Sequence, residues 1–593
     1  MWFRISLMVV LALPLGAAFG ADDPAIARAA FTVLKTRCHR CHGGKDQKTP
    51  GLDVLRRETL VLKRGEGDGA YAFVVPGQPD SSVLWQHVES DYMPQSGSQE
   101  AKEMTAAERE TLKQWIAAQA PFPKRREVVF RTEAESLKAI RDFVLKNKAD
   151  DRPYLRFFSL AHLANNEDLL EEDLRLHRAA LSKLINSVSL ESKLVLPQPV
   201  PETNETIYYV DLRKLGWDKR DLWREILKQY PYGLKFDSVR DEEIREVAKD
   251  LIDFSKSDLP YVRADWFIVA AAQPPLYHTL LDLPRHLHEL EHRLGVPFAE
   301  NFRMANASNP RLARAGFARS GVSQQNRLVE RHETTTGLYY WISYDFKPRK
   351  ARGDLVRFPL GPKFDGNPHN RFAFDHDGGE AIFSLANGMQ AYLLLNAKGE
   401  RLDDPAPADV VNDSRSIAGT PAIINGISCM NCHRRGMIGN FRDEIRGAGA
   451  VGGQVLTKVE DLYPKPEVMD QLVKLDEDRF MKALEVVIGP FLKVGDDKQK
   501  SVGDFPEPIG KVAEMYLSDL DIRRAALELG IDRPELLQAK IEANRDLMKL
   551  GLGTFVQKRP GTIKRAKWET REGTSLFQDV CVELRLGIVP VSH

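Results

Sequence analysis

Two short runs of this sequence share the pattern Cys-x-x-Cys-His, one at residues 38–42 and the other at residues 429–433. Each run brings two thiols and an imidazole close enough together in sequence to bind one common ligand. Four of the five cysteines belong to these runs, which is not the spacing of a disulfide framework. The fold must therefore bring the same three kinds of side chain together at two places, almost four hundred residues apart in sequence.

This pattern is the attachment signature for c-type haem. Two thiols separated by two residues both reach the vinyl groups on one edge of a porphyrin, and the adjacent histidine turns its imidazole toward the iron. We therefore expect two covalently bound haem c groups, each with its iron. The predicted haem-binding residues are Cys38, Cys41 and His42 for the first haem and Cys429, Cys432 and His433 for the second, with His42 and His433 as iron ligands.

Other interpretations of a C-x-x-C pair are a redox disulfide, half of a zinc site, or chance. Both pairs here carry the histidine and both follow an export signal, which favours haem. A zinc ribbon also uses two such pairs, but these lie in distant segments of different character. Cys581 has no histidine or cysteine near it and is expected to be a buried thiol without a role.

The first twenty residues have the pattern of a secretory signal peptide. Arg4 supplies a basic start, residues 5–15 are apolar, and residues 17–20 end in small side chains. The apolar run is short for a bilayer, and no later segment approaches roughly 18 uninterrupted apolar residues. We expect an exported protein in a periplasmic or other extracytoplasmic compartment, with no transmembrane segment in the mature chain.

The charge balance argues against nucleic-acid binding. Lys plus Arg and Asp plus Glu both total 84, so the formal net charge is zero and no overall basic field attracts a polyanion. At 593 residues the chain also exceeds what one hydrophobic core supports, so several domains are expected.

The residues around the first motif predict a small helical module. Apolar residues at helical spacing predict a helix over residues 24–37, and Thr105 with Glu108 forms the capping box of a second helix that runs through residues 112–116. Between them stands Met93, followed by proline. A thioether on the sixth position of iron raises the reduction potential relative to two histidines, and Met93 is the candidate, with Met104 the other local methionine.

Residues 31–124 resemble the planctomycete-type cytochrome c domain. The resemblance is carried by C-H-R-C-H-G at residues 38–43, V-P-G at residues 75–77, Met93 with its proline, and the helix over residues 112–116. It implies His42 and Met93 as axial ligands. The sequence departs from the family at Gln95, where a second proline is common.

The second motif follows a β-rich segment. Aromatic and β-branched residues at 339–346 predict a strand, and Asn387-Gly388 between two apolar runs predicts a hairpin. Motifs at residues 320–323, 326–327, 376–380 and 425–429 resemble a poorly characterised module that accompanies planctomycete-type cytochromes. Met430 and Met437 are too close to His433 in sequence to be its distal partner, so the remote candidates are Met389 and His376.

Together these patterns predict a multidomain protein, mainly α with a mixed α/β part. Helical spacing in the middle predicts helices over residues 134–148, 152–164 and 169–187. The predicted segments are a signal peptide at 1–20, a helical cytochrome c domain with the first haem at 21–124, a helical region at 125–260, a mixed α/β domain with a β-hairpin and the second haem motif at 261–460, and a helical C-terminal region at 461–593.

Three functions fit two haems. The favoured one is electron transfer, in which both haems pass single electrons to and from redox partner proteins. A dihaem oxidoreductase of peroxidase-like logic, with an open second iron, would make the protein an enzyme. The third is a haem-bearing scaffold or sensor associated with the cell envelope.

Overall fold

The computed structural model describes residues 24–43, 49, 51–94, 104–237, 239–306, 310–318, 326–347, 352–407, 411, 422–558, 560–569 and 573–588. The predicted signal peptide, Gln95 and the motif at residues 320–323 lie outside them. The chain divides into two compact units, one of residues 1–127 with 558–560 and one of residues 128–557 with 561–593. The predicted domain boundaries at residues 124, 260 and 460 stay predictions.

The first unit begins with helix α1 (Pro24–Val33), which continues as a π-helical turn, η1 (Leu34–Cys38), into the short α2 (His39–His42). In this turn the His39 amide donates to the Leu34 carbonyl. The predicted helix is confirmed, but the π turn was not foreseen. Such turns are frequent at functional sites, and this one ends at the first cysteine of the first motif.

The predicted capping box is confirmed at the start of α6 (Ala106–Ala117). Thr105 Oγ1 accepts from the Glu108 amide at 3.2 Å, and Glu108 accepts from the Thr105 amide at 2.6 Å. Glu108 also accepts from Arg37 Nε at 3.1 Å, which links α6 to the chain just before the first motif. The inward face of α6 is fully buried and consists of Leu112, Trp115 and Ile116.

The second unit opens with helices and a sheet. Helices α7 (Glu133–Lys146) and α9 (Glu171–Ser187) confirm two of the three predicted middle helices. The third prediction, a helix over residues 152–164, is wrong. The middle of that segment is strand β1 (Leu155–Ser159), with only the short helical turns η4 (Arg152–Tyr154) and α8 (Ala161–Ala164) on either side of it. β1 lies inside a sheet of order β2-β3-β1-β4 with β2 (Gln198–Pro199), β3 (Ile207–Asp211) and β4 (Tyr261–Arg263).

The error has a physical cause. Every residue of β1 is buried, so the alternation of a half-exposed strand is missing and a short apolar run looks the same in a helix. β1 pairs antiparallel with β3 and parallel with β4, which satisfies its backbone on both edges.

The C-terminal part is helical, as predicted, and packs against helix α9. Lys183 of α9 forms a buried ion pair with Glu507, 2.7 Å between Nζ and Oε1. Its helices are α17 (Gln454–Leu462), α18 (Pro466–Leu492), α19 (Pro508–Tyr516), α20 (Ile522–Glu528), α21 (Pro534–Ala543), α22 (Arg545–Lys549), α23 (Arg565–Glu569) and α24 (Leu576–Glu583).

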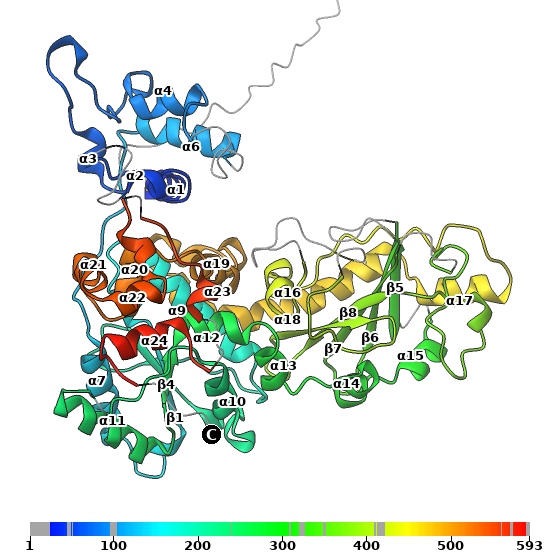
Figure 1. The fold of residues 1–593 in the computed structure, drawn as a ribbon. Helices are drawn as coiled ribbons and strands as arrows, with labels where there is room; N and C mark the ends of the chain where they lie inside the picture. The colour runs from blue at the N-terminus through cyan, green and yellow to red at the C-terminus, as the bar shows by residue number, and fades with distance from the viewer. Residues whose placement is uncertain are drawn as a thin grey trace, which may run out of the picture. The chain divides into compact units, whose positions relative to one another are not determined.

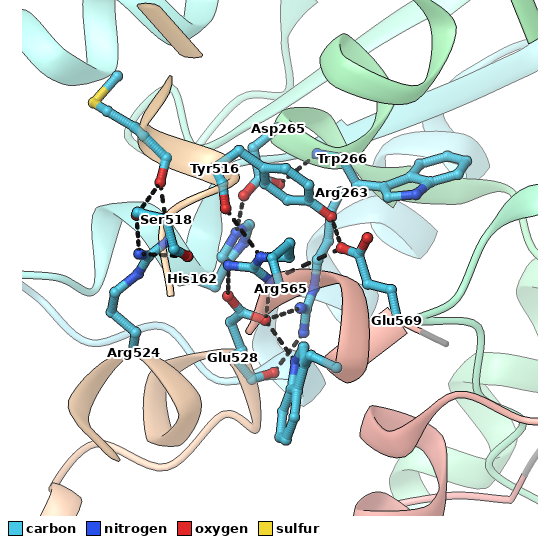
Figure 2. A network of polar contacts seen from close by, with 12 residues as sticks. His162, Arg263, Asp265, Trp266, Tyr516, Ser518, Arg524, Glu528, Arg565 and Glu569 are labelled. Carbon is cyan, nitrogen blue, oxygen red and sulfur yellow. Dashed lines mark hydrogen bonds and ion pairs between the residues drawn. The ribbon is translucent and has the colours of Figure 1, made fainter. Parts of the chain in front are cut away.

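A buried polar network joins the C-terminal helices to residues near the start of the second unit (Figure 2). Arg565 of α23 forms a double ion pair with Glu528 of α20, at 2.7 and 3.0 Å. Glu528 is also approached by Arg263 of β4 at 3.3 Å, and His162 lies 2.9 Å from Asp265. The network therefore ties elements more than three hundred residues apart in sequence into one core.

The predicted strand and hairpin belong to an antiparallel sheet of order β5-β6-β7-β8-β9 (Figure 1). Asn387 and Gly388 form the turn between the last two strands, and Gly388 has a φ of 87°. The strands are β5 (Leu312–Phe317), β6 (Arg327–Glu333), β7 (Tyr339–Asp345), β8 (Gly378–Ser384) and β9 (Gln390–Asn396). Over the described ranges, no helix is long and apolar enough to cross a bilayer.

Candidate haem sites

The first motif stands where the π turn meets α2. Burial of its thiol, followed by the neighbouring Cys41, raises the pKa of Cys38 to about 12, whereas Cys41 is exposed. His42 is half-buried, and its Nδ1 lies 3.4 Å from Thr49 Oγ1. The His42 carbonyl accepts from the Val54 amide at 2.9 Å, so the chain folds back directly behind the motif.

Met93 and Met104 differ in burial. Met93 is half-buried on the loop after helix α4 (Val83–Glu89), and its amide donates to the His87 carbonyl at 2.9 Å. Met104 is 8% exposed and belongs to the hydrophobic core. Met93 is therefore the more exposed of the two methionines and is not part of the hydrophobic core, which leaves its thioether available as an iron ligand.

The second motif lies on a cavity in the other unit. Its cysteines are on helix α16 (Ile427–Cys432), and His433 is the next residue. The side chains of Cys429, Cys432 and His433 all contribute to the wall of one cavity of about 710 Å³. This volume is within the range of roughly 300–1,000 Å³ that small-molecule and cofactor sites occupy.

One face of the five-stranded sheet forms the opposite wall. Alternate residues of a strand share a face, and those on this face are Arg327 and Val329 of β6, Trp341, Ser343 and Asp345 of β7, Glu380 and Ile382 of β8, and Leu394 and Asn396 of β9. Phe441 extends the wall, stacked on Phe317 at 6.0 Å. The wall thus combines apolar side chains, such as Trp341, Ile382 and Phe441, with a polar cluster on neighbouring strands.

Helix α18 supports this wall from within the same unit. Asp476 of α18 accepts from Arg331 through two bonds of 2.7 and 2.9 Å, and from Trp341 Nε1 at 2.8 Å. Trp341 itself lines the cavity, so the buried carboxylate fixes the orientation of a wall residue.

His433 has the geometry of a metal-binding imidazole. Its Nδ1 lies 3.1 Å from the Gly436 carbonyl, which makes Nδ1 the protonated nitrogen and leaves the Nε2 lone pair for a metal. Burial lowers its pKa, so the neutral ring that binds iron is the stable form. The ring packs at 6.0 Å from that of Tyr392.

Cys429 is a buried, protonated thiol. Burial is the main cause that raises its pKa well above the ordinary value, and Glu380 adds to it through its charge and through a hydrogen bond with the thiol. Glu380 therefore lies directly beside the first cysteine of the second motif.

The start of α16 is held by helix α13 (Leu276–Leu280). Gly426, the residue before α16, has a φ of 85°, and a Cβ there would lie 2.3 Å from the Ala272 carbonyl oxygen. Asn425 donates to His278 Nε2 at 2.6 Å, and His278 Nδ1 lies 3.0 Å from Asp403. Backbone and side chain together fix where the motif enters the cavity.

Neither remote candidate for a distal ligand faces this cavity. Met389 is fully buried in a separate cluster with residues of α18, and the His376 ring packs on Tyr344, which lies on the other face of the sheet. Met437 does line the cavity, whereas Met430 does not. The sequence patterns predicted no role for Arg327, Asp345 or Glu380, although Arg327 and Glu380 belong to the motifs at residues 326–327 and 376–380.

Comparison with protein families gives one match. Residues 38–97 match the family described as Planctomycete cytochrome C. These residues are a planctomycete-type cytochrome c domain. The predicted resemblance is thereby confirmed for the segment that carries the first motif and Met93, and a cytochrome c domain implies covalently bound haem c.

The match to the planctomycete-type cytochrome c family ends well before the second motif. The assignment of that motif to haem therefore depends on its C-x-x-C-H pattern and on the geometry of its cavity. Searches of curated proteins and of solved structures found no match to the chain.

Proposed function

We propose that this protein is an exported dihaem c-type cytochrome that transfers electrons. The observation that carries the second haem is that Cys429, Cys432 and His433, which attach and ligate haem in the C-x-x-C-H pattern, line a single cavity of about 710 Å³. A disulfide or a zinc half-site requires no such space.

The chemistry of the donor set fits haem c. Two thiols on adjacent turns of α16 reach one edge of a porphyrin, and His433 presents Nε2 because Nδ1 is bonded to Gly436. The aromatic and aliphatic side chains of the wall exclude water from a flat apolar ring. Haem, when bound, supplies one-electron redox chemistry, and these residues attach it, orient it and keep it dry.

For the first haem, we propose Cys38 and Cys41 as attachment residues and His42 with Met93 as iron ligands. The cytochrome c domain supports this assignment, and so does the half-buried position of Met93. Reduced redox partner proteins would deliver electrons in a periplasmic or other extracytoplasmic compartment, in line with the signal pattern of residues 1–20.

One observation favours a second function, a dihaem oxidoreductase whose second iron is open. Among the described residues that line the second cavity, His433 is the only histidine and Met437, four positions later, the only methionine. No remote segment that the structure describes brings a histidine or methionine there, but the wall carries buried charged groups.

The test is haem stoichiometry. Expressed with its leader in a host that attaches haem c, the wild type should carry two haems that survive denaturing electrophoresis, because thioether bonds persist when the fold is lost. The double variant Cys429→Ser/Cys432→Ser should carry one, and the control Cys581→Ser should keep two. A wild-type stoichiometry of one, or zinc in place of iron, would refute the dihaem proposal.

The same preparations test the first iron. Met93→His should retain two haems but lower the reduction potential of one of them, because an imidazole replaces a thioether. Met104→Leu is the matched control. A potential that does not move in Met93→His would exclude Met93 as a ligand.

A further inference from the structure

A cluster of polar side chains interrupts the apolar wall of the second cavity. Arg327 of β6 is the register partner of Asp345 of β7, and Ser343 of β7 is the partner of Glu380 of β8. All four side chains are on the cavity face of the sheet. They meet only because three strands align, since 53 positions separate Arg327 from Glu380.

The cluster is close-knit and largely buried. Arg327 Nε lies 3.0 Å from Asp345 Oδ1, and Arg327 Nη2 donates to Ser343 Oγ at 2.9 Å and lies 3.8 Å from Glu380 Oε2. The exposed fractions of the Arg327, Asp345 and Glu380 side chains are 13%, 3% and 14%.

Two atoms of the cluster are unsatisfied. Arg327 Nε and Asp345 Oδ1 lie 3.0 Å apart as an ion pair, but neither of these two atoms makes a hydrogen bond with any described residue. The two side chains are hydrogen-bonded only through Arg327 Nη2 and Asp345 Oδ2, at 3.5 Å. Buried polar atoms are normally hydrogen-bonded. A buried donor and a buried acceptor thus stand side by side on a cavity wall.

Haem attachment would open a third position. The Cys429 thiol is bonded to Glu380, but the sulfur of a thioether has no proton to donate. Once Cys429 is joined to a porphyrin, Glu380 needs a new donor. This step rests on the proposed function.

The charges of the cluster select the ligand. Two carboxylates face one guanidinium, so the cluster has an excess of negative charge and disfavours an anion. Burial raises the pKa of Asp345 to about 6 although Arg327 opposes the shift, which shows how little solvent reaches this carboxyl. A molecule that fits here must be neutral, accept from arginine and donate to a carboxylate.

Haem propionates do not meet these requirements. They are anionic, and they lie on the porphyrin edge opposite the vinyl groups. Glu380 contacts Cys429, so the cluster begins at the vinyl edge.

We infer that Arg327, Asp345 and Glu380 form a binding site beside the second haem for a small uncharged molecule with O–H donors, of the hydroperoxide class. Arg327 donates to one oxygen of this ligand, and the two carboxylates accept its protons. The site would give the oxidoreductase candidate a place for a substrate, because the cluster and His433 line the same cavity.

The test uses the ferric holoprotein with two haems and follows the Soret band during titration with hydrogen peroxide, azide and, after reduction, carbon monoxide. Asp345→Asn should raise the peroxide concentration for half-saturation about tenfold or more, the equivalent of one lost charge-assisted hydrogen bond. Carbon monoxide, which makes no strong hydrogen bonds, should bind both proteins alike. The matched control is Glu444→Gln, which removes another carboxyl from the cavity lining.

Arg327→Lys provides a second variant that keeps the charge but loses the planar fork, and it should weaken peroxide binding in the same way. Equal half-saturation in Asp345→Asn, Arg327→Lys and Glu444→Gln, or tighter binding of azide than of peroxide, would overturn this inference while two haems remain. A peroxide response that persists in Cys429→Ser/Cys432→Ser would overturn it as well. A haem count of one would instead overturn the proposed function and this inference together.

Discussion

At the scale of single residues, the five-stranded sheet holds a buried charge on the face away from the cavity. Glu330 of β6 has no solvent exposure and lies 2.5 Å from Arg314 and 2.7 Å from His332 Nε2. Burial alone would raise the pKa of its carboxyl, but Arg314 and then His332 outweigh burial and lower the pKa to about 2. The ionised form is therefore the native one.

This shift predicts a pH-dependent stability. Because the folded pKa is below the ordinary value of about 4.5, Glu330 stabilises the fold fully above that pH, and the contribution is lost as the pH falls toward 2. Glu330→Gln should lower the free energy of unfolding by about 3 kcal/mol at pH 7 and by progressively less below pH 4.5. Denaturant titrations at several pH values measure this difference.

Glu333→Gln is the control, because Glu333 is on the same strand but exposed. The assignment fails if the two variants show the same loss at pH 7 or the same pH dependence.

At the scale of elements, the entry to α16 decides where the second motif lies. Gly426 adopts a positive φ and sits against the Ala272 carbonyl and the Tyr277 ring, so a side chain has neither the conformation nor the space. The helix that carries Cys429 and Cys432 is thus positioned by a backbone contact outside the motif.

Gly426→Ala should displace α16 and lower incorporation of the second haem by at least half, with the first haem unaffected. Gly449→Ala is a matched control, since Gly449 also has a positive φ but a Cβ there meets nothing within 4 Å. Haem staining of the two variants separates the steric effect from backbone strain. Full incorporation in Gly426→Ala would show that α16 does not need this close approach.

At the scale of the whole molecule, the larger unit is closed by contacts between distant segments. Arg565 is 3% exposed and binds Glu528 (Figure 2). It also donates to the Tyr232 hydroxyl at 2.8 Å. The contact with Tyr232 connects the C-terminal helices to a residue more than three hundred positions earlier. Contacts of this kind hold the second unit together as one compact unit.

Arg565→Ala should destabilise the second unit by about 3 kcal/mol, because the buried Glu528 loses its double ion pair and keeps only the longer contact to Arg263 and the neutral Trp568 Nε1 donor at 3.0 Å. Lys564→Ala, in a side chain that is 81% exposed, should change stability by less than about 0.5 kcal/mol. Denaturant midpoints of the two variants provide the comparison. Similar midpoints would mean that the network does not hold the unit together.

Features whose physics is local were predicted from the sequence. The C-x-x-C-H runs can be recognised in the sequence because haem attachment requires thiols at fixed spacing. The family match confirms the first domain. The capping box of Thr105 and Glu108 and the turn at Asn387-Gly388 depend on residues within a few positions of one another, and both are present.

Tertiary structure alone decided what distant residues share. The sequence could not show that β1 is a strand, because burial on both faces erases its alternation. Nor could it show that His376 and Met389 face away from the second cavity while Arg327, Asp345 and Glu380 meet on its wall. Strand register sets those neighbours, and register depends on the whole sheet rather than on spacing along the chain.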